Sequence, residues 1–185
     1  VEYQPLGTIG LISPWNFPVV LTFGPLGSIF AAGNRVMIKP SEFTPRTSEL
    51  MKKMFEDNFS EEEVAVITGG PEVGEDFSSL PFDHLLFTGA TSIGRHVMRA
   101  ASENLVPVTL ELGGKSPVII SDTSNVEQSS KRIIAGKTMN AGQICLAPDY
   151  VLLPENKLDK FIMHAKETVS LMFPSIKDNN DYTSV

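Results

Sequence analysis

The sequence contains one cysteine, three histidines and no strongly basic segment, and each scarcity excludes a class of site or partner. One thiol cannot form an internal disulfide, and a structural zinc cluster needs several Cys or His ligands close in space. Lysine and arginine number 15 against 22 acidic residues, which gives a formal net charge of -7. No basic run could follow a phosphate backbone, so a nucleic acid partner is not expected. The small number of Cys and His residues likewise predicts no metal site.

Long apolar runs are also missing. The longest candidate, from Val19 to Ala32, is interrupted by Thr22, Pro25 and two glycines, whereas a membrane helix needs roughly 20 predominantly apolar residues in a row. The chain opens without a basic segment or a cleavage site, so any targeting signal would lie outside it. We therefore expect no membrane span in this segment and a cytoplasmic location.

The residues that are present have an ordinary globular composition, 42% hydrophobic and 20% charged. Short β-branched runs alternate with longer amphipathic stretches, which is typical of a mostly parallel sheet covered by helices. The short runs predict strands at Thr8–Ile12, Arg35–Lys39, Val64–Thr68, His84–Phe87, Val106–Leu110, Pro117–Ser121 and Tyr150–Leu153.

The longer stretches predict helices with recognisable starts. The helix at Pro45–Phe59 begins with Thr44 as N-cap and with proline at its first position, where the missing N–H costs nothing. The helix at Asn125–Asn140 follows Ser124 and Glu127, which have the spacing of a capping box. Gly113 and Gly114 follow the predicted strand at residues 106–110. Paired glycines allow a sharp change of backbone direction, so a domain boundary is expected there.

One amide side chain lies in a rigid loop after the first predicted strand. The segment is Ser13-Pro14-Trp15-Asn16-Phe17-Pro18, in which two prolines restrict the backbone. An asparagine held in this way can donate an N–H to an oxygen that becomes negative during a reaction. A structural turn, in which Asn16 bonds its own backbone, is an equally good interpretation.

Two further segments follow predicted strands, at the edge where ligands bind in open α/β sheets. Lys39 and Glu42 together can hold the hydroxyls of a ribose, although a solvated ion pair is the more common explanation for an isolated pair of this spacing. The stretch from Phe87 to Arg95 passes through Gly89 into a predicted helix, whose free N–H groups would attract a pyrophosphate. It lacks the spacing of a Walker loop or of GxGxxG, and a helix cap without a ligand would look the same.

The last two segments supply a carboxylate and a thiol. Glu111 lies just past an apolar strand, where burial would raise the pKa of its carboxyl group toward the range useful to a general base. Alternatively, Lys115 simply neutralises its charge. The segment from Asn140 to Cys145 ends a predicted helix in a glycine-containing turn that presents the only thiol. A lone cysteine is more often core packing than nucleophile, but the polar, glycine-rich flank favours the nucleophile. None of the histidines has a motif-like context, which makes Glu111 the natural partner of Cys145.

Taken in this order, the five segments resemble the aldehyde dehydrogenase superfamily over nearly the whole chain. The strings FTGATSIGR, VTLELGGKSP and MNAGQICLAPDY are each similar to family signatures. Glu111 precedes Cys145 by 34 positions (145 − 111), the separation typical of the family's base and nucleophile. MNAGQICLAPDY and DNNDYTSV are most similar to the subgroup of class 3 and coniferyl aldehyde dehydrogenases.

The resemblance implies an α/β fold in two parts. Residues 1–112 would form part of an NAD(P)-binding domain, a Rossmann-like, mostly parallel sheet with helices on both faces. Residues 113–185 would form the truncated start of a second α/β domain, the catalytic one. Family members are much longer, so the chain is expected to be a fragment that is inactive by itself, and its parent is expected to be a homodimer.

The implied activity is oxidation of an aromatic, coniferyl-type or fatty aldehyde to its acid, with NAD or NADP as cofactor. Cys145 would attack the aldehyde carbon, and the Asn16 amide with the Cys145 backbone N–H would form the oxyanion hole. Glu111 would activate the water that hydrolyses the thioester. Glu42 favours NAD, yet class 3 members with this residue also accept NADP. Two alternatives stay open: an inactive nucleotide-binding fragment, and a CoA-acylating relative that uses the same thioester.

The residues that the resemblance assigns to the cofactor lie at predicted strand ends and in glycine turns. They are Ile12, Pro14, Trp15, Lys39, Ser41, Glu42, Gly70, Thr88, Gly89, Ala90, Thr91, Ser92, Ile93, Gly94, Leu112 and Gly113. In many family members a serine stands at the position of Ala90, and the serine hydroxyl helps to hold the pyrophosphate. This chain lacks that hydroxyl.

Overall fold

The computed structural model describes residues 2–184. The chain divides into two compact units, one that ends at Leu112 and one that begins at Gly113. Within residues 2–184, no helix has the length and apolar character that a membrane span requires.

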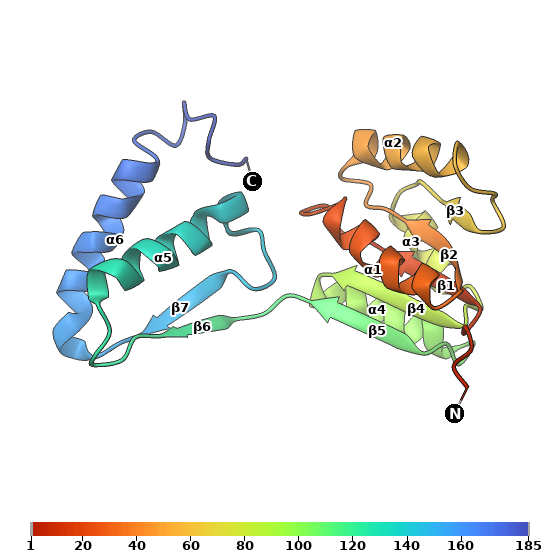
Figure 1. Ribbon diagram of the computed structural model, residues 1–185, viewed down its shortest axis with the longest axis horizontal. Helices are drawn as coiled ribbons and strands as arrows, with labels where there is room; N and C mark the ends of the chain where they lie inside the picture. The colour runs from red at the N-terminus through yellow and green to blue at the C-terminus, as the bar shows by residue number, and fades with distance from the viewer. Residues whose placement is uncertain (1, 185) are drawn as a thin grey trace. The chain divides into compact units, whose positions relative to one another are not determined.

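The first unit is a five-stranded sheet with helices on both faces (Figure 1). Its strand order is β3-β2-β1-β4-β5, and every neighbouring pair is parallel. The elements in chain order are β1 (Thr8–Ile12), α1 (Val20–Ala31), β2 (Arg35–Lys39), α2 (Pro45–Glu56), β3 (Val64–Val66), α3 (Pro71–Ser78), β4 (His84–Gly89), α4 (Thr91–Ser102) and β5 (Val108–Leu112). This topology confirms the predicted Rossmann-like α/β fold, a parallel sheet with helices on both faces.

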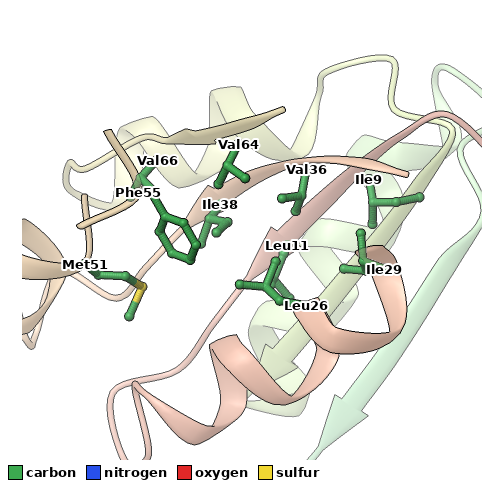
Figure 2. Close-up of a cluster of buried hydrophobic side chains, with 10 residues drawn as sticks. All are labelled: Ile9, Leu11, Leu26, Ile29, Val36, Ile38, Met51, Phe55, Val64 and Val66. Atoms are coloured by element: carbon green, nitrogen blue, oxygen red, sulfur yellow. The ribbon is translucent and has the colours of Figure 1, made fainter. Parts of the chain in front are cut away.

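Two buried clusters hold the helices to the sheet. Alternate residues of a strand face opposite sides, so β1, β2 and β3 bury one row of aliphatic side chains against α1 and α2. Figure 2 shows this cluster, which consists of Ile9, Leu11, Leu26, Ile29, Val36, Ile38, Met51, Phe55, Val64 and Val66. The second cluster involves β4, α3 and α4 and consists of Phe77, Phe82, Leu85, Phe87, Val97, Ala101 and Val106.

The second unit contains two parallel strands and two long helices. Its elements are β6 (Ser116–Ile119), α5 (Val126–Thr138), the 3-10 turn η1 (Met139–Gly142), β7 (Pro148–Leu152), the 3-10 turn η2 (Glu155–Lys157) and α6 (Leu158–Met172). Helices α5 and α6 pack together, and the Ser130 hydroxyl, fully buried between them, donates to the Val126 carbonyl at 2.8 Å.

The predicted capping box at the start of α5 is wrong. Asn125 is the N-cap, and its side-chain oxygen accepts the backbone N–H of Gln128 at 3.0 Å. The Ser124 hydroxyl instead accepts the N–H of Ser121 at 3.2 Å and closes the preceding turn. Asn125 therefore satisfies a free donor of the helix from one residue further along the chain than predicted.

Several predicted ends of strands and helices differ from the observed ones. The ends of two strands extend because of their pairing. β4 continues to Gly89 and β5 to Leu112, since Gly89 lies opposite Leu112 in the ladder. Helix α2 ends at Glu56, three residues before the predicted end. The Thr44 side chain makes no capping hydrogen bond, although proline does occupy the first turn of α2 as predicted.

Candidate functional site

The candidate residues of the first unit gather at one edge of its sheet. All five strands run parallel, so their carboxyl ends lie at the same edge, with Ile12 opposite both Lys39 and Phe87, and Thr88 opposite Glu111. The direction of winding reverses between β1 and β4, which are neighbours in the sheet. In open α/β sheets, ligands bind at such a reversal, outside the carboxyl ends of the strands.

The loop that carries Asn16 is anchored to helix α1. Thr22, which is fully buried, places its hydroxyl 2.6 Å from the Pro18 carbonyl and 2.7 Å from the Ser13 hydroxyl. The Ser13 backbone N–H donates to the Lys39 carbonyl at 3.2 Å, which ties the loop to the neighbouring strand end. Asn16 is half-buried within this anchored loop. Sequence reasoning missed the role of Thr22, whose only signal is a polar residue in an apolar helix.

Lys39 and Glu42 form a partly buried ion pair beside a cavity. Lys39 is 3% exposed, and its Nζ donates to Glu42 at 3.2 Å and to the Pro40 carbonyl at 2.9 Å. Burial raises the pKa of Glu42, but hydrogen bonds from its own backbone and from Lys39, with the charge of Lys39, together lower it below its ordinary value. Glu42 is therefore ionised at neutral pH. The adjoining cavity, of about 270 Å³, is lined by Pro40, Ser41, Glu42, Pro45, Ser48, Glu49, Thr68 and Gly69.

The segment from Thr88 to Gly94 comprises the end of β4, Ala90 and the first turn of α4. Gly94 is buried, and a Cβ at this position would lie 2.9 Å from a terminal carbon of the Leu112 side chain, so a larger residue would require the Leu112 side chain to shift. Ala90 is the N-cap, with extended backbone and no side-chain hydrogen bond to the helix. The side chains of Thr91, Ser92 and Ile93 are exposed, and the first N–H groups of a helix have no partner within it. This helix end can therefore receive an anion.

Ala90→Ser is expected to stabilise the first unit by about 1 kcal/mol, because a serine hydroxyl can cap a helix start that alanine leaves open. Equilibrium chemical unfolding of the full-length protein measures the change. Ala100→Ser, the same substitution inside α4, is the control and should destabilise by roughly 0.5 kcal/mol, because serine has the lower helix propensity. Equal effects at both positions would contradict the assignment of Ala90 as a deficient cap.

Cys145 is exposed and follows a turn with unusual backbone geometry. Asn140 and Ala141 have left-handed conformations with φ of 50° and 55°, and Gly142 has φ of 77°. The Gln143 side chain donates to the Asn140 carbonyl at 2.9 Å and holds the turn closed. The thiol is therefore not part of the core of the second unit.

Glu111 is the residue before the last one of β5, where it lies opposite Thr88 of β4. The burial expected for its side chain is not found. The side chain is exposed within the first unit, because alternate residues of edge strand β5 face outward without a covering helix. Lys115, the alternative partner, instead lies 3.3 Å from Asp149 in the second unit. Asn16 and Glu111 thus belong to the first unit and Cys145 to the second. Within residues 2–184, no group of three His, Cys, Asp or Glu side chains could hold a metal ion.

The sequence profile of the aldehyde dehydrogenase family matches residues 1–183. The chain belongs to the aldehyde dehydrogenase family. This aldehyde dehydrogenase chain carries its sheet-edge candidates on the first unit and its one cysteine, which is exposed, on the second.

Two bacterial proteins are similar over the whole chain. Identity is 65% over 185 residues to the "Probable coniferyl aldehyde dehydrogenase" of Caulobacter vibrioides and 60% over 185 residues to the "Coniferyl aldehyde dehydrogenase" of Pseudomonas sp. HR199. The chain spans 38% of the length of each. Among solved structures, a mutant aldehyde dehydrogenase C from Pseudomonas syringae, in complex with NAD+ and octanal, is similar with a TM-score of 0.87 and 31% identity. That similarity covers 91% of this chain and 36% of the other.

Proposed function

We propose that the full-length protein oxidises a coniferyl-type aldehyde to its carboxylic acid, with NAD or NADP as hydride acceptor. The observation that carries this proposal is the 60% identity, across all 185 residues, to a coniferyl aldehyde dehydrogenase. The segments that would do the chemistry all lie within the matched region.

The described residues of the first unit fit a dinucleotide. Lys39 and Glu42 form a charged pair next to a cavity, which suits the two hydroxyls of a ribose. The open start of α4 after Ala90 suits a pyrophosphate, and it directly follows the end of β4. Leu112, at the end of β5, would face the nicotinamide. When bound, the dinucleotide accepts a hydride from the carbon that is oxidised.

Three residues would carry the covalent steps. The Cys145 thiolate forms a bond from Sγ to the aldehyde carbon, whose oxygen becomes an oxyanion. The Asn16 amide and the Cys145 backbone N–H donate to this oxygen. Loss of hydride leaves a thioester on Cys145. Glu111 then removes a proton from water as the water oxygen attacks the thioester carbon, and the C–S bond breaks to give the acid and the Cys145 thiolate.

A substrate panel tests this proposal. The purified full-length protein should form NADH or NADPH with coniferyl aldehyde, and kcat/KM should be at least about 10-fold higher than with an aliphatic aldehyde of similar length. Mass spectrometry should identify ferulic acid as the product. Formation of the acyl-CoA thioester or the acyl phosphate in place of the free acid, when CoA or phosphate is added, would instead indicate an acyl-transferring relative, and the absence of any aldehyde oxidation would contradict the proposal.

A further inference from the structure

We infer that Glu49 selects against the 2′-phosphate of NADP, so that this protein prefers NAD; the inference rests on the proposed dinucleotide site at Lys39 and Glu42. Glu49 lies seven residues beyond Glu42 and belongs to none of the motifs that indicated the site. The structure places it on the wall of the same cavity.

The cavity adjoins the group that would hold the ribose. Glu42 forms part of its wall, so a substituent on the ribose oxygen that Glu42 binds would enter it. Its volume of about 270 Å³ is large enough to admit a phosphate group. Ser48 is one of the residues with a hydroxyl at the cavity wall. Its hydroxyl already donates to the backbone carbonyls of Ser41 and Thr44, both at 3.0 Å.

The charges around the cavity disfavour a dianion. Sites that accept NADP place an arginine or lysine near the 2′-phosphate. Within residues 2–184, no lysine or arginine lines this cavity, whereas Glu42 and Glu49 both do. Lys39, the adjacent cation, is already bonded to Glu42 and to a backbone carbonyl.

The start of helix α2, at the cavity wall, would attract a phosphate, and Glu49 opposes it. Pro45, the first residue of α2, has no N–H to offer, although the helix dipole still favours an anion there. Glu49 lies one turn further along α2, and none of the described ion pairs neutralises its carboxylate. Its negative charge therefore belongs to the wall of the cavity that a 2′-phosphate would enter.

The affinities of the full-length protein for NAD and NADP, measured by calorimetry, test this inference. The wild type should bind NAD more tightly. Glu49→Gln should lower the ratio of dissociation constants, NADP over NAD, by about 3- to 10-fold, and Glu49→Lys should lower it further. Glu56→Gln, which removes the same charge about 10 Å further along α2, should leave the ratio unchanged.

Salt dependence distinguishes charge repulsion from a structural effect. The wild-type ratio should fall as ionic strength rises, and it should fall less in Glu49→Gln, because salt screens the repulsion. An unchanged ratio in Glu49→Gln, or an equal loss of affinity for both dinucleotides, would overturn the inference. A protein that binds both dinucleotides but oxidises no aldehyde would contradict only the proposed function, whereas one that binds neither would overturn both.

Discussion

Cys145→Ala is expected to abolish aldehyde oxidation by the full-length protein, with a loss of at least ~10⁴-fold in kcat. Cys145 is the only cysteine of the chain, and its side chain is exposed after a turn held by Gln143. Alanine removes the sulfur that would bond to the aldehyde carbon, and no other residue of the chain carries a thiol. Steady-state NADH production with coniferyl aldehyde measures the effect.

Two measurements separate lost chemistry from lost structure in this variant. Dinucleotide affinity should stay within about two-fold of wild type, because Lys39 and Glu42 lie on the other unit. A thiol-specific reagent should label the wild type at one residue of this chain and inactivate it, and bound aldehyde should slow the labelling. Substantial residual activity in Cys145→Ala would refute the thioester mechanism.

Glu111→Gln is expected to lower steady turnover by ~10²–10⁴-fold while retaining a burst of NADH in the first turnover. Glutamine keeps the shape of the side chain at the end of β5 but cannot take a proton from water. Hydride loss precedes that step, so one equivalent of NADH should form as the acyl-enzyme accumulates. Stopped-flow absorbance at saturating aldehyde resolves the burst from the steady phase.

The control for this variant is Glu103→Gln, an exposed carboxylate at the end of α4. It removes the same charge from the same unit and should change neither phase. Disappearance of the burst in Glu111→Gln would indicate that Glu111 activates the Cys145 thiol instead of water. Raising the pH should partly restore turnover of Glu111→Gln, because hydroxide replaces the water that needs a base.

The fold of the first unit was predictable because its signals are local. The bounds of β1 and β2 agree with the prediction, since each is a short apolar run between turn residues. The predicted capping box at Ser124 failed, because Ser124 and Asn125 both have N-cap side chains and only the path of the preceding turn decides between them. The bounds of β5 shifted for a related reason, since strand ends depend on the partner strand.

The sequence by itself determined the alternation of strands and helices and the identity of the chemical groups: one thiol, one loop amide and a carboxylate after an apolar strand. These follow from side-chain type and periodicity, which are properties of a few neighbouring residues. Only the tertiary structure decided that the Thr22 hydroxyl anchors the Asn16 loop, that Glu111 is exposed, and that Glu49 lines the cavity beside Glu42. Each of these depends on how separate elements pack, and packing brings together residues whose spacing in the chain carries no signal.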